Sequence, residues 1–208
     1  MQRPSLDAFG CALDALRAGQ AVVFPTDTVF GLGVSVLHAQ SSQVLYDIKK
    51  RDAGKPIAWL VRSVDDLSFY GHDVPPWARL LAAKFWPGDL TLVVRAAQSV
   101  PKAFRSEANT IGLRMPNSPC VLRLIEEVGS PLATTSANRS GAADVVAYEA
   151  IDPRIASQVS AIIPGWGSIS QGVSSTVIDA TTQTPHILRA GARAHLMRQE
   201  LVQSGISF

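Results

Sequence analysis

Residues 21–37 read AVVFPTDTVFGLGVSVL and combine two short apolar runs with a polar segment between them. Residues 21–24 form a β-branched run that predicts a buried strand, and Pro25 ends it. Residues 31–37 predict a second strand. Two hydroxyls and a carboxylate lie between the runs, and two glycines then let the backbone turn sharply or approach a ligand closely. The local chemistry indicates a tight turn between two strands, with a ligand site as the alternative.

Helical and strand patterns interleave along the rest of the chain. Apolar residues at three- and four-residue steps predict a first helix over residues 6–16, stopped near Gly19. The late strands follow one another without a long helix, so some pairing should be antiparallel. We therefore expect an α/β fold with a twisted mixed sheet and flanking helices. Further helices are predicted at 44–48, 77–85, 121–128 and 193–203, further strands at 56–61, 90–94, 111–115, 132–134, 161–163, 176–179 and 187–189, and a mobile polar loop at 138–147.

The composition is that of a globular protein with balanced charge. Of 208 residues, 47% are apolar and 17% charged, and this length fits a single domain over residues 1–208. Because 19 basic residues face 17 acidic ones, a dedicated duplex-binding protein is excluded and any basic site must be local. The first twenty residues show no signal peptide, and no apolar run is long enough to span a membrane. We expect a cytoplasmic protein that does not enter the membrane.

Neither the cysteines nor the histidines are spaced for a metal site. Cys11 and Cys120 lie far apart and form no Cys-x-x-Cys pair, so they indicate neither a disulfide framework nor zinc ligation. The four histidines show no ligand spacing either. The sequence therefore predicts no metal held by protein side chains.

Residues 49–56 read KKRDAGKP and place four cations within seven positions at the end of a predicted helix. Cations at a helix C-terminus interact favourably with the helix dipole, and that explanation needs no ligand. Here, however, the glycine and Lys55 carry the positive charge past the helix into the next strand. Phosphate binding would use such an arrangement, with arginine as a fork and lysine as a point charge.

Residues 132–141 read LATTSANRSG, a predicted strand that continues into small and polar residues. Such residues often cap helices and turns, but their backbone amides also form anion-binding concavities. Residues 110–116 and 174–179 each place a hydroxyl or an arginine at a strand edge, and Arg189 ends another strand. With the basic cluster, these segments predict an open, concave, basic site.

In their order along the chain, these segments resemble the YrdC family of threonylcarbamoyl-AMP synthases, from about residue 6 to residue 191. Six ordered motifs make the resemblance specific, whereas one alone would be weak. The motifs are 25–32 (PTDTVFGL), 49–51 (KKR), 87–91 (PGDLT), 112–116 (GLRMP), 135–138 (TSAN) with 140–141 (SG), and 175–179 (STVID). The resemblance implies a YrdC-like fold in the short form, without the extra C-terminal domain that some members carry.

The resemblance also implies an enzyme, a nucleotidyltransferase. The family condenses L-threonine, bicarbonate or carbon dioxide, and ATP into threonylcarbamoyl adenylate and pyrophosphate. A partner transferase complex then moves the threonylcarbamoyl group onto the tRNA adenosine next to the anticodon, and a weak tRNA contact is compatible with this role. Magnesium would be carried by the ATP phosphates, because the sequence offers no dedicated carboxylate cage.

The resemblance also implies roles for single residues, which follow from their positions in the motifs. Lys49 and Arg51 would be the catalytic residues, since they supply positive charge where phosphates react. Asn138 would shape the nucleotide loop as part of the ATP site. The threonine ligands would be Thr26, Arg51, Arg114 and Thr134. The ATP or adenylate ligands would be Lys49, Thr110, Ser136, Asn138, Ser175 and Arg189.

Four positions depart from the family pattern. Asp27 and Phe30 stand where many members have glutamate and tyrosine. Ser174 stands where a proline often precedes the Ser-Thr-Val motif, and Asp144 lies where a second serine is expected. An acid beside phosphates would repel them, so Asp144 should point away or approach a metal.

Two other functions remain open at the level of sequence. One is an RNA- or ribosome-binding protein that uses the same basic concavity, which the nearly neutral net charge disfavours. The other is a paralogue with a different carbamoyl or adenylyl substrate, which the complete Thr-Ser-Ala-Asn segment disfavours.

Overall fold

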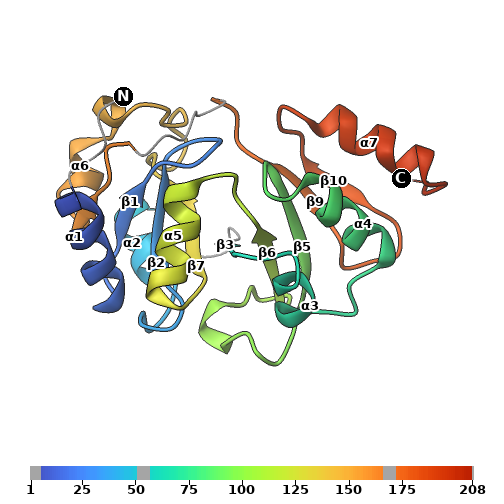
Figure 1. The fold of residues 1–208 in the computed structure, drawn as a ribbon, viewed down its shortest axis with the longest axis horizontal. Coiled ribbons are helices and arrows are strands. Elements are labelled where there is room, and N and C mark those ends of the chain that lie inside the picture. Colours follow the sequence, from blue (N-terminus) through green and yellow to red (C-terminus); the bar gives the residue numbers. More distant parts are fainter. Residues whose placement is uncertain (1–5, 51–56, 166–171, 208) are drawn as a thin grey trace.

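The computed structural model describes residues 6–50, 57–165 and 172–207 (Figure 1). The helices are α1 (Leu6–Arg17), α2 (Gln43–Lys49), α3 (Asp66–Tyr70), α4 (Pro76–Phe85), α5 (Pro119–Val128), α6 (Pro153–Ala156) and α7 (Ala194–Gln203), with 3₁₀ turns η1 (Lys102–Phe104) and η2 (Tyr148–Ala150). The strands are β1 (Val22–Phe24), β2 (Gly31–Ser35), β3 (Ala58–Leu60), β4 (Gly71–His72), β5 (Leu90–Ala96), β6 (Thr110–Arg114), β7 (Leu132–Ser136), β8 (Ala161–Ile162), β9 (Thr176–Asp179) and β10 (His186–Arg189).

These strands form one twisted sheet in the order β10-β9-β5-β6-β3-β7-β2-β1-β8, with β4 paired to β5. The pairs β1–β2, β2–β7, β3–β7, β5–β6 and β9–β10 are antiparallel. The pairs β1–β8, β3–β6 and β5–β9 are parallel. The expectation of a mixed sheet with flanking helices is thus confirmed.

One face of the sheet is packed against helices along most of its width. Leu90, Leu92 and Val94 alternate along β5 and belong to the same buried cluster as side chains of α2, α4 and α7. Because side chains of a strand alternate between faces, Thr91 and Val93 must point to the opposite face. The larger apolar side chains of the central strands therefore build one core.

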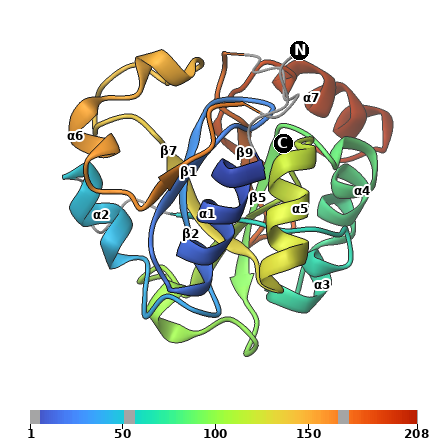
Figure 2. The ribbon, with the colours of Figure 1, turned by 60° about the vertical axis from the view of Figure 1, so that its left-hand side comes forward.

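The other face is covered at only one end. Helices α1 and α5 lie side by side (Figures 1 and 2) and bury an apolar cluster with Phe24 of β1 and Leu132 of β7. On β3, β6 and β5, the paired residues Ala58, Gly112 and Val93 share this face. All three line a cavity rather than contact a helix. Small side chains on the central strands thus leave room for a site.

The helices and strands predicted from the sequence are confirmed, with ends that differ by a few residues. The sequence missed α3, β4, α6 and the two 3₁₀ turns, which are too short to show a periodic pattern. Residue 56, the predicted start of β3, lies outside the described residues. Residues 138–147 contain no helix or strand, and their mobility remains a prediction. Among the described residues, no helix has the length and apolar character needed to cross a membrane.

Gly31 of β2 allows a close approach that a larger residue would prevent. A Cβ atom at this position would lie 2.7 Å from Cε2 of Phe24 and 3.1 Å from Cγ2 of Thr134. Since overpacking a core costs about 1–3 kcal/mol, we expect Gly31→Ala to lower the free energy of unfolding by that amount in urea titrations.

Gly10 of α1 provides the matched control, because a Cβ there would meet nothing within 4 Å. Gly10→Ala should leave stability unchanged or raise it by up to about 1 kcal/mol, since alanine favours helix. If both variants had the same stability, the close packing around Gly31 would not limit this position.

Candidate functional site

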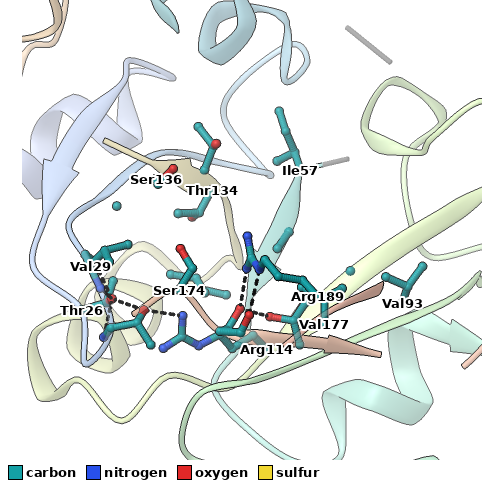
Figure 3. Close-up of a pocket in the computed structure, with 18 of the residues that line it drawn as sticks. Thr26, Val29, Ile57, Val93, Arg114, Thr134, Ser136, Ser174, Val177 and Arg189 are labelled. Carbon is teal, nitrogen blue, oxygen red and sulfur yellow. Dashed lines mark hydrogen bonds between the residues drawn. The ribbon is translucent and has the colours of Figure 1, made fainter. Parts of the chain in front are cut away.

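A cavity of about 360 Å³ opens on the partly covered face of the sheet (Figure 3). Its walls come from the β1–β2 turn, the central strands, the end of β7 and the segment that leads into β9. The lining residues are Thr26, Thr28, Val29, Phe30, Gly31, Ile57, Ala58, Leu60, Thr91, Val93, Gly112, Arg114, Thr134, Thr135, Ser136, Ser174, Ser175, Val177, Leu188 and Arg189. Segments distant in sequence thus meet at one site, and five of the six motifs contribute residues to its lining.

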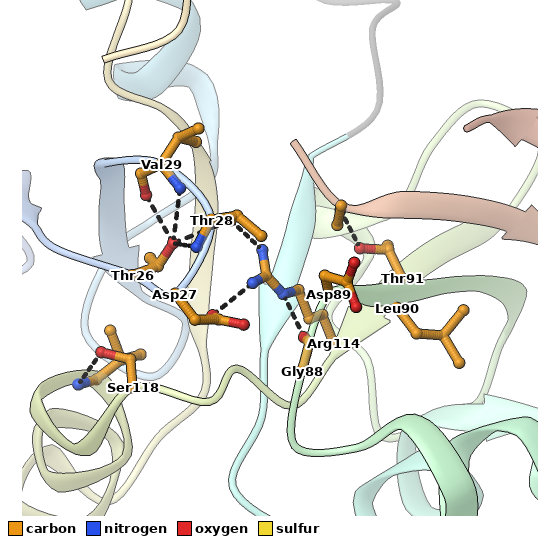
Figure 4. A network of polar contacts seen from close by, with 12 residues as sticks. Thr26, Asp27, Thr28, Val29, Gly88, Asp89, Leu90, Thr91, Arg114 and Ser118 are labelled. Atoms are coloured by element: carbon orange, nitrogen blue, oxygen red, sulfur yellow. Dashed lines mark hydrogen bonds and ion pairs between the residues drawn. The ribbon is translucent and has the colours of Figure 1, made fainter. Parts of the chain in front are cut away.

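Arg114 is held in this site by hydrogen bonds to three other residues (Figure 4). Its Nε donates to the carbonyl of Gly88 at 2.9 Å and its Nη1 to Oγ1 of Thr28 at 2.8 Å. Its Nη2 forms an ion pair with Oδ1 of Asp27 at 2.5 Å, and both side chains are 8% exposed. Three of the five N–H groups of the guanidinium are thereby used, and two remain for a ligand.

Opposing effects act on the pKa of the Arg114 guanidinium. Burial lowers the pKa of its guanidinium, while the carboxylates of Asp27 and Asp89 raise it. Arg189 lowers the same pKa because a second cation lies nearby. Since arginine stays protonated even when buried, the site holds a positive charge that an anion would stabilise.

Thr26 lies at the centre of the β1–β2 turn. Its hydroxyl donates to the carbonyl of Val29 at 2.6 Å and accepts from the backbone N–H groups of Thr28 and Val29. It also lies 3.1 Å from the hydroxyl of Thr28. Thr26 therefore lines the cavity, as predicted, but its hydroxyl also holds the turn that presents Thr28 to Arg114. The same segment thus forms both a tight turn and part of the cavity wall.

Ser175 and Arg189 form the opposite part of the site. Arg189 donates from Nε to the carbonyl of Ser175 at 2.9 Å and from Nη2 to its hydroxyl at 3.0 Å. The hydroxyl of Thr91 lies 2.8 Å from the hydroxyl of Ser175. Thr91 of β5, to which the sequence assigned no role, thus fixes a predicted nucleotide ligand.

Lys49 does not line the cavity but lies behind one of its walls. It is the last residue of α2 and is 2% exposed. Its ammonium donates to the carbonyls of Ser136 and Asn138 and, at 3.0 Å, to Oδ1 of Asn138. A buried ammonium needs such partners. The geometry makes Lys49 a support of the residues 136–138 loop.

The loop residues complete this arrangement. Ser136, which lines the cavity, donates to Oδ1 of Asn138 at 2.6 Å, and Nδ2 of Asn138 donates to the carbonyl of Ala142 at 2.6 Å. Asn138 therefore shapes the loop from within, as predicted, rather than lining the cavity. Thr134 lines the cavity, and its hydroxyl bonds to the carbonyl of Leu132 at 3.0 Å.

Two other predicted ligands differ in their placement. Thr110, at the start of β6, lies outside the cavity lining, and its hydroxyl is 2.7 Å from that of Ser106 in the preceding turn. The predicted nucleotide role of Thr110 is therefore not supported by a place in the cavity. Arg51, predicted for catalysis and threonine binding, lies outside the described residues, as does Lys55.

The four departures from the family pattern have structural partners. Asp27 bonds to Arg114, so the shorter carboxylate still reaches a cation. The backbone of Phe30 accepts from Ala137 at 2.8 Å and donates to Val145 at 2.7 Å; the residue is part of the cavity lining, and its side chain is buried in the main core cluster. Ser174 donates to the carboxylate of Asp144 at 2.5 Å. Asp144 is thus bound to Ser174 at the rim of the cavity but is not itself among the lining residues.

The donor set does not form a cage for a metal ion. No group of three or more histidine, cysteine, aspartate or glutamate residues that could hold a metal occurs in the described ranges. At the rim, Asp144 offers a single carboxylate, which is engaged by Ser174. This chemistry fits a metal that enters bound to a ligand rather than one held by the protein.

The sequence missed Thr28, Thr91 and Asp89 as members of the site or its support. Thr28 and Thr91 lie in quoted motifs, and the alternation of β5 would have placed Thr91 opposite the core residues Leu90 and Leu92. No local signal could reveal the partners of Asp89, because they lie on distant segments.

The arrangement can bind an extended anionic ligand. Arg114 and Arg189 face the same cavity, with Thr26 and Val29 to one side and Val93 to the other (Figure 3). The described lining residues include both arginines and no carboxylate. The hydroxyl groups of Thr134, Ser136 and Ser175 add neutral polar surface to the same cavity. The described residues of the site offer positioning and charge neutralisation, and none of them is an activated nucleophile.

Comparison with known proteins gives a consistent assignment. The family model for Sua5/YciO/YrdC proteins, described as "Telomere recombination", matches residues 14–191, so α7 lies beyond the match. The threonylcarbamoyl-AMP synthase of Pyrococcus abyssi is 36% identical over 85% of this chain and 52% of its own length. This chain therefore spans about half of that relative. A putative threonylcarbamoyl-AMP synthase of Mycobacterium tuberculosis is 37% identical over 86% of this chain and 82% of its own.

Solved structures agree with this result. The structure of P. abyssi Sua5 complexed with L-threonine matches with a TM-score of 0.82 and 35% identity, covering 88% of this chain and 54% of that one. The structure of Escherichia coli YciO matches with a TM-score of 0.80 and 29% identity, covering 92% of each chain. The shared fold, the ordered motifs and the converging cavity residues lead to one conclusion: the chain belongs to the Sua5/YciO/YrdC family.

Proposed function

We propose that the chain is a threonylcarbamoyl-AMP synthase, an enzyme that joins L-threonine, bicarbonate or carbon dioxide, and ATP. The observation that carries the proposal is the pairing of Arg114 and Arg189 in one cavity among small and hydroxyl-bearing residues. Two nearby cations with no carboxylate among the described lining residues favour a ligand with anionic groups. Relatives named threonylcarbamoyl-AMP synthase, among them one from Bacillus subtilis at 32% identity, support this choice.

The amino acid is assigned to the Arg114 side of the cavity. The two remaining N–H groups of Arg114 suit a carboxylate, because guanidinium and carboxylate form paired hydrogen bonds. Thr26, Thr28 and Thr134 lie around this position and supply small polar walls. The relative from P. abyssi has been solved with L-threonine, which supports an amino-acid site in this fold.

The nucleotide is assigned to the Arg189 side. Arg189 and Ser175 are held by their mutual hydrogen bonds, so their remaining polar atoms keep a fixed direction. The lining residues Val177 and Leu188 add apolar surface beside them. Ser136 and the loop behind it, held by Lys49, face the same space.

The reaction needs positioning more than side-chain chemistry. The threonine amine forms a carbamate with carbon dioxide; starting from bicarbonate, one water is lost. A carbamate oxygen then attacks the α-phosphorus of ATP, the bond to the β-phosphate oxygen breaks, and pyrophosphate leaves. Fixed cations near the phosphorus stabilise the charge that develops, as in other phosphoryl transfers.

Magnesium fits this scheme as an ion bound to the ATP phosphates, where it would neutralise part of their charge. Asp144 lies at the rim where it could meet such an ion. The product would pass to a partner transferase complex that modifies tRNA next to the anticodon. Threonine, ATP and tRNA meet in the cytoplasm, where we expect the reaction.

A second function is favoured by one finding. E. coli YciO, which carries the description "Uncharacterized protein", is 31% identical over 86% of this chain and 87% of its own length. The chain could therefore act on a different carbamoyl or adenylyl substrate with the same cavity. An RNA-binding role without catalysis is less favoured, because the net charge is only +2.

Pyrophosphate release from ATP distinguishes these functions. We expect release that requires both L-threonine and bicarbonate, because the attacking carbamate forms only when both are present. A coupled phosphate assay with each component omitted in turn provides the measurement, and mass spectrometry identifies the adenylate. Release with another amine and not with threonine would support the paralogue, and no release with any amine would refute the synthase.

Lys49→Met tests the support of the nucleotide loop. The change leaves the carbonyls of Ser136 and Asn138 without their ammonium donor, at a cost of about 1–3 kcal/mol for each unsatisfied group. We expect a lower free energy of unfolding and a roughly tenfold weaker affinity for ATP, equivalent to about 1.4 kcal/mol. Urea titration and isothermal titration calorimetry provide the two measurements.

Lys50→Met is the matched control, because Lys50 is the next residue along the chain and is exposed. It removes the same charge and should leave stability and ATP affinity near wild type. Equal effects at the two positions would show that net charge, rather than the buried contacts of Lys49, determines ATP binding.

A further inference from the structure

Asp89 is a buried carboxylate with only one of its oxygens bound. Its side chain is 1% exposed, and Oδ1 accepts from Nε of Arg193 at 2.6 Å. Nη2 of Arg193 contacts the same oxygen. Oδ2 is buried and has no hydrogen-bond partner within the described part of the chain. A buried charge of this kind strongly favours any further cation that can reach it.

Arg114 is such a cation. Gly88, the neighbour of Asp89 in the sequence, accepts a hydrogen bond from Nε of Arg114, so the Arg114 guanidinium reaches the backbone next to Asp89. Figure 4 shows Asp89 on the opposite side of Arg114 from Asp27. The charge of Asp89 also acts on Arg114, since it raises the pKa of the guanidinium. Two buried carboxylates therefore compete for one arginine.

Arg193 changes the balance of this competition. It lies at the N-terminal end of α7, with its guanidinium 5.9 Å from the centre of the Phe85 ring. A Cβ atom on Gly88 would collide with Nη2 of Arg193, so this guanidinium is packed directly against the backbone that Arg114 binds. Arg193 therefore neutralises Asp89 from the start of α7.

We propose that Arg193 is a positioning residue for the cavity: by neutralising Asp89, it keeps Arg114 bound to Asp27 and Thr28. Without Arg193, the unpaired carboxylate draws the Arg114 guanidinium away from the turn, and the two N–H groups that face the ligand lose their direction. Arg193 does not line the cavity and acts only by preventing Arg114 from exchanging Asp27 for Asp89. The expected effect of Arg193 on threonine affinity rests on the proposed function, whereas the expected movement of Arg114 from Asp27 to Asp89 does not.

The test compares Arg193→Met with the double variant Arg193→Met/Asp89→Asn. Methionine keeps the aliphatic contact and removes the charge, while asparagine removes the competing carboxylate. Isothermal titration with L-threonine should show roughly tenfold or greater loss of affinity for Arg193→Met, the equivalent of about 1.4 kcal/mol. The double variant should recover to within about threefold of wild type, by the same arithmetic less than about 0.7 kcal/mol.

Lys84→Met is the matched control. Lys84 of α4 forms an ion pair with Glu200 of α7, so this change removes a different charge contact between α7 and the rest of the protein. It does not touch Asp89, and threonine affinity should stay at the wild-type value. If Lys84→Met weakened threonine binding as much as Arg193→Met does, looser packing of α7 would explain the effect and the proposal would fail.

The crystal structure of Arg193→Met provides a readout that needs no ligand. The proposal predicts that Nη2 of Arg114 leaves Asp27 for Asp89, and it is overturned if Arg114 keeps its wild-type contacts. A double variant as impaired as the single one also overturns it. Should Arg193→Met not fold, the double variant must fold, because it lacks the unpaired charge. Absence of threonine binding by the wild-type protein would contradict the proposed function and leave the structural test in force.

Discussion

The site depends on one buried interaction, the binding of Arg114 to the β1–β2 turn and to the backbone before β5. Its guanidinium connects Asp27, Thr28 and Gly88, three residues that lie far from it in the sequence. Removing one partner of a buried ion pair commonly costs about 3–5 kcal/mol, so this contact strongly constrains the turn. The conformation of this turn fixes the positions of Thr26 and Val29, which form one wall of the cavity.

The sheet makes this interaction available to a ligand. On β5, the large side chains of Leu90 and Leu92 point to the helix-covered face, whereas the small residues Ala58 and Gly112 of the neighbouring strands lie on the other. Helices α1 and α5 cover only the β1 end of that second face. The cavity occupies the remaining part, so both arginines and the hydroxyl groups meet on a rigid sheet rather than on loops alone.

The element pattern and the mixed sheet were predicted from the sequence, because periodicity and ordered motifs report local structure and family. Six of the residues that line the cavity were also named from the sequence: Thr26, Arg114, Thr134, Ser136, Ser175 and Arg189. Lys49 was predicted beside the phosphates, yet it is buried behind the loop, since only the fold shows which acceptors a lysine reaches. The pairs Asp27–Arg114 and Asp89–Arg193 join residues 87 and 104 positions apart and leave no local pattern. Short elements such as α3 and α6 also lack a readable period.

The affinity of the Arg114→Lys variant for L-threonine tests the central claim most directly. Lysine keeps the charge but cannot contact Asp27, Thr28, Gly88 and a carboxylate in the geometry of a guanidinium. Isothermal titration calorimetry on the folded variant should show affinity reduced by roughly 10- to 150-fold, which corresponds to a charged hydrogen bond of about 1.5–3 kcal/mol. An affinity equal to that of the wild-type protein would contradict the account.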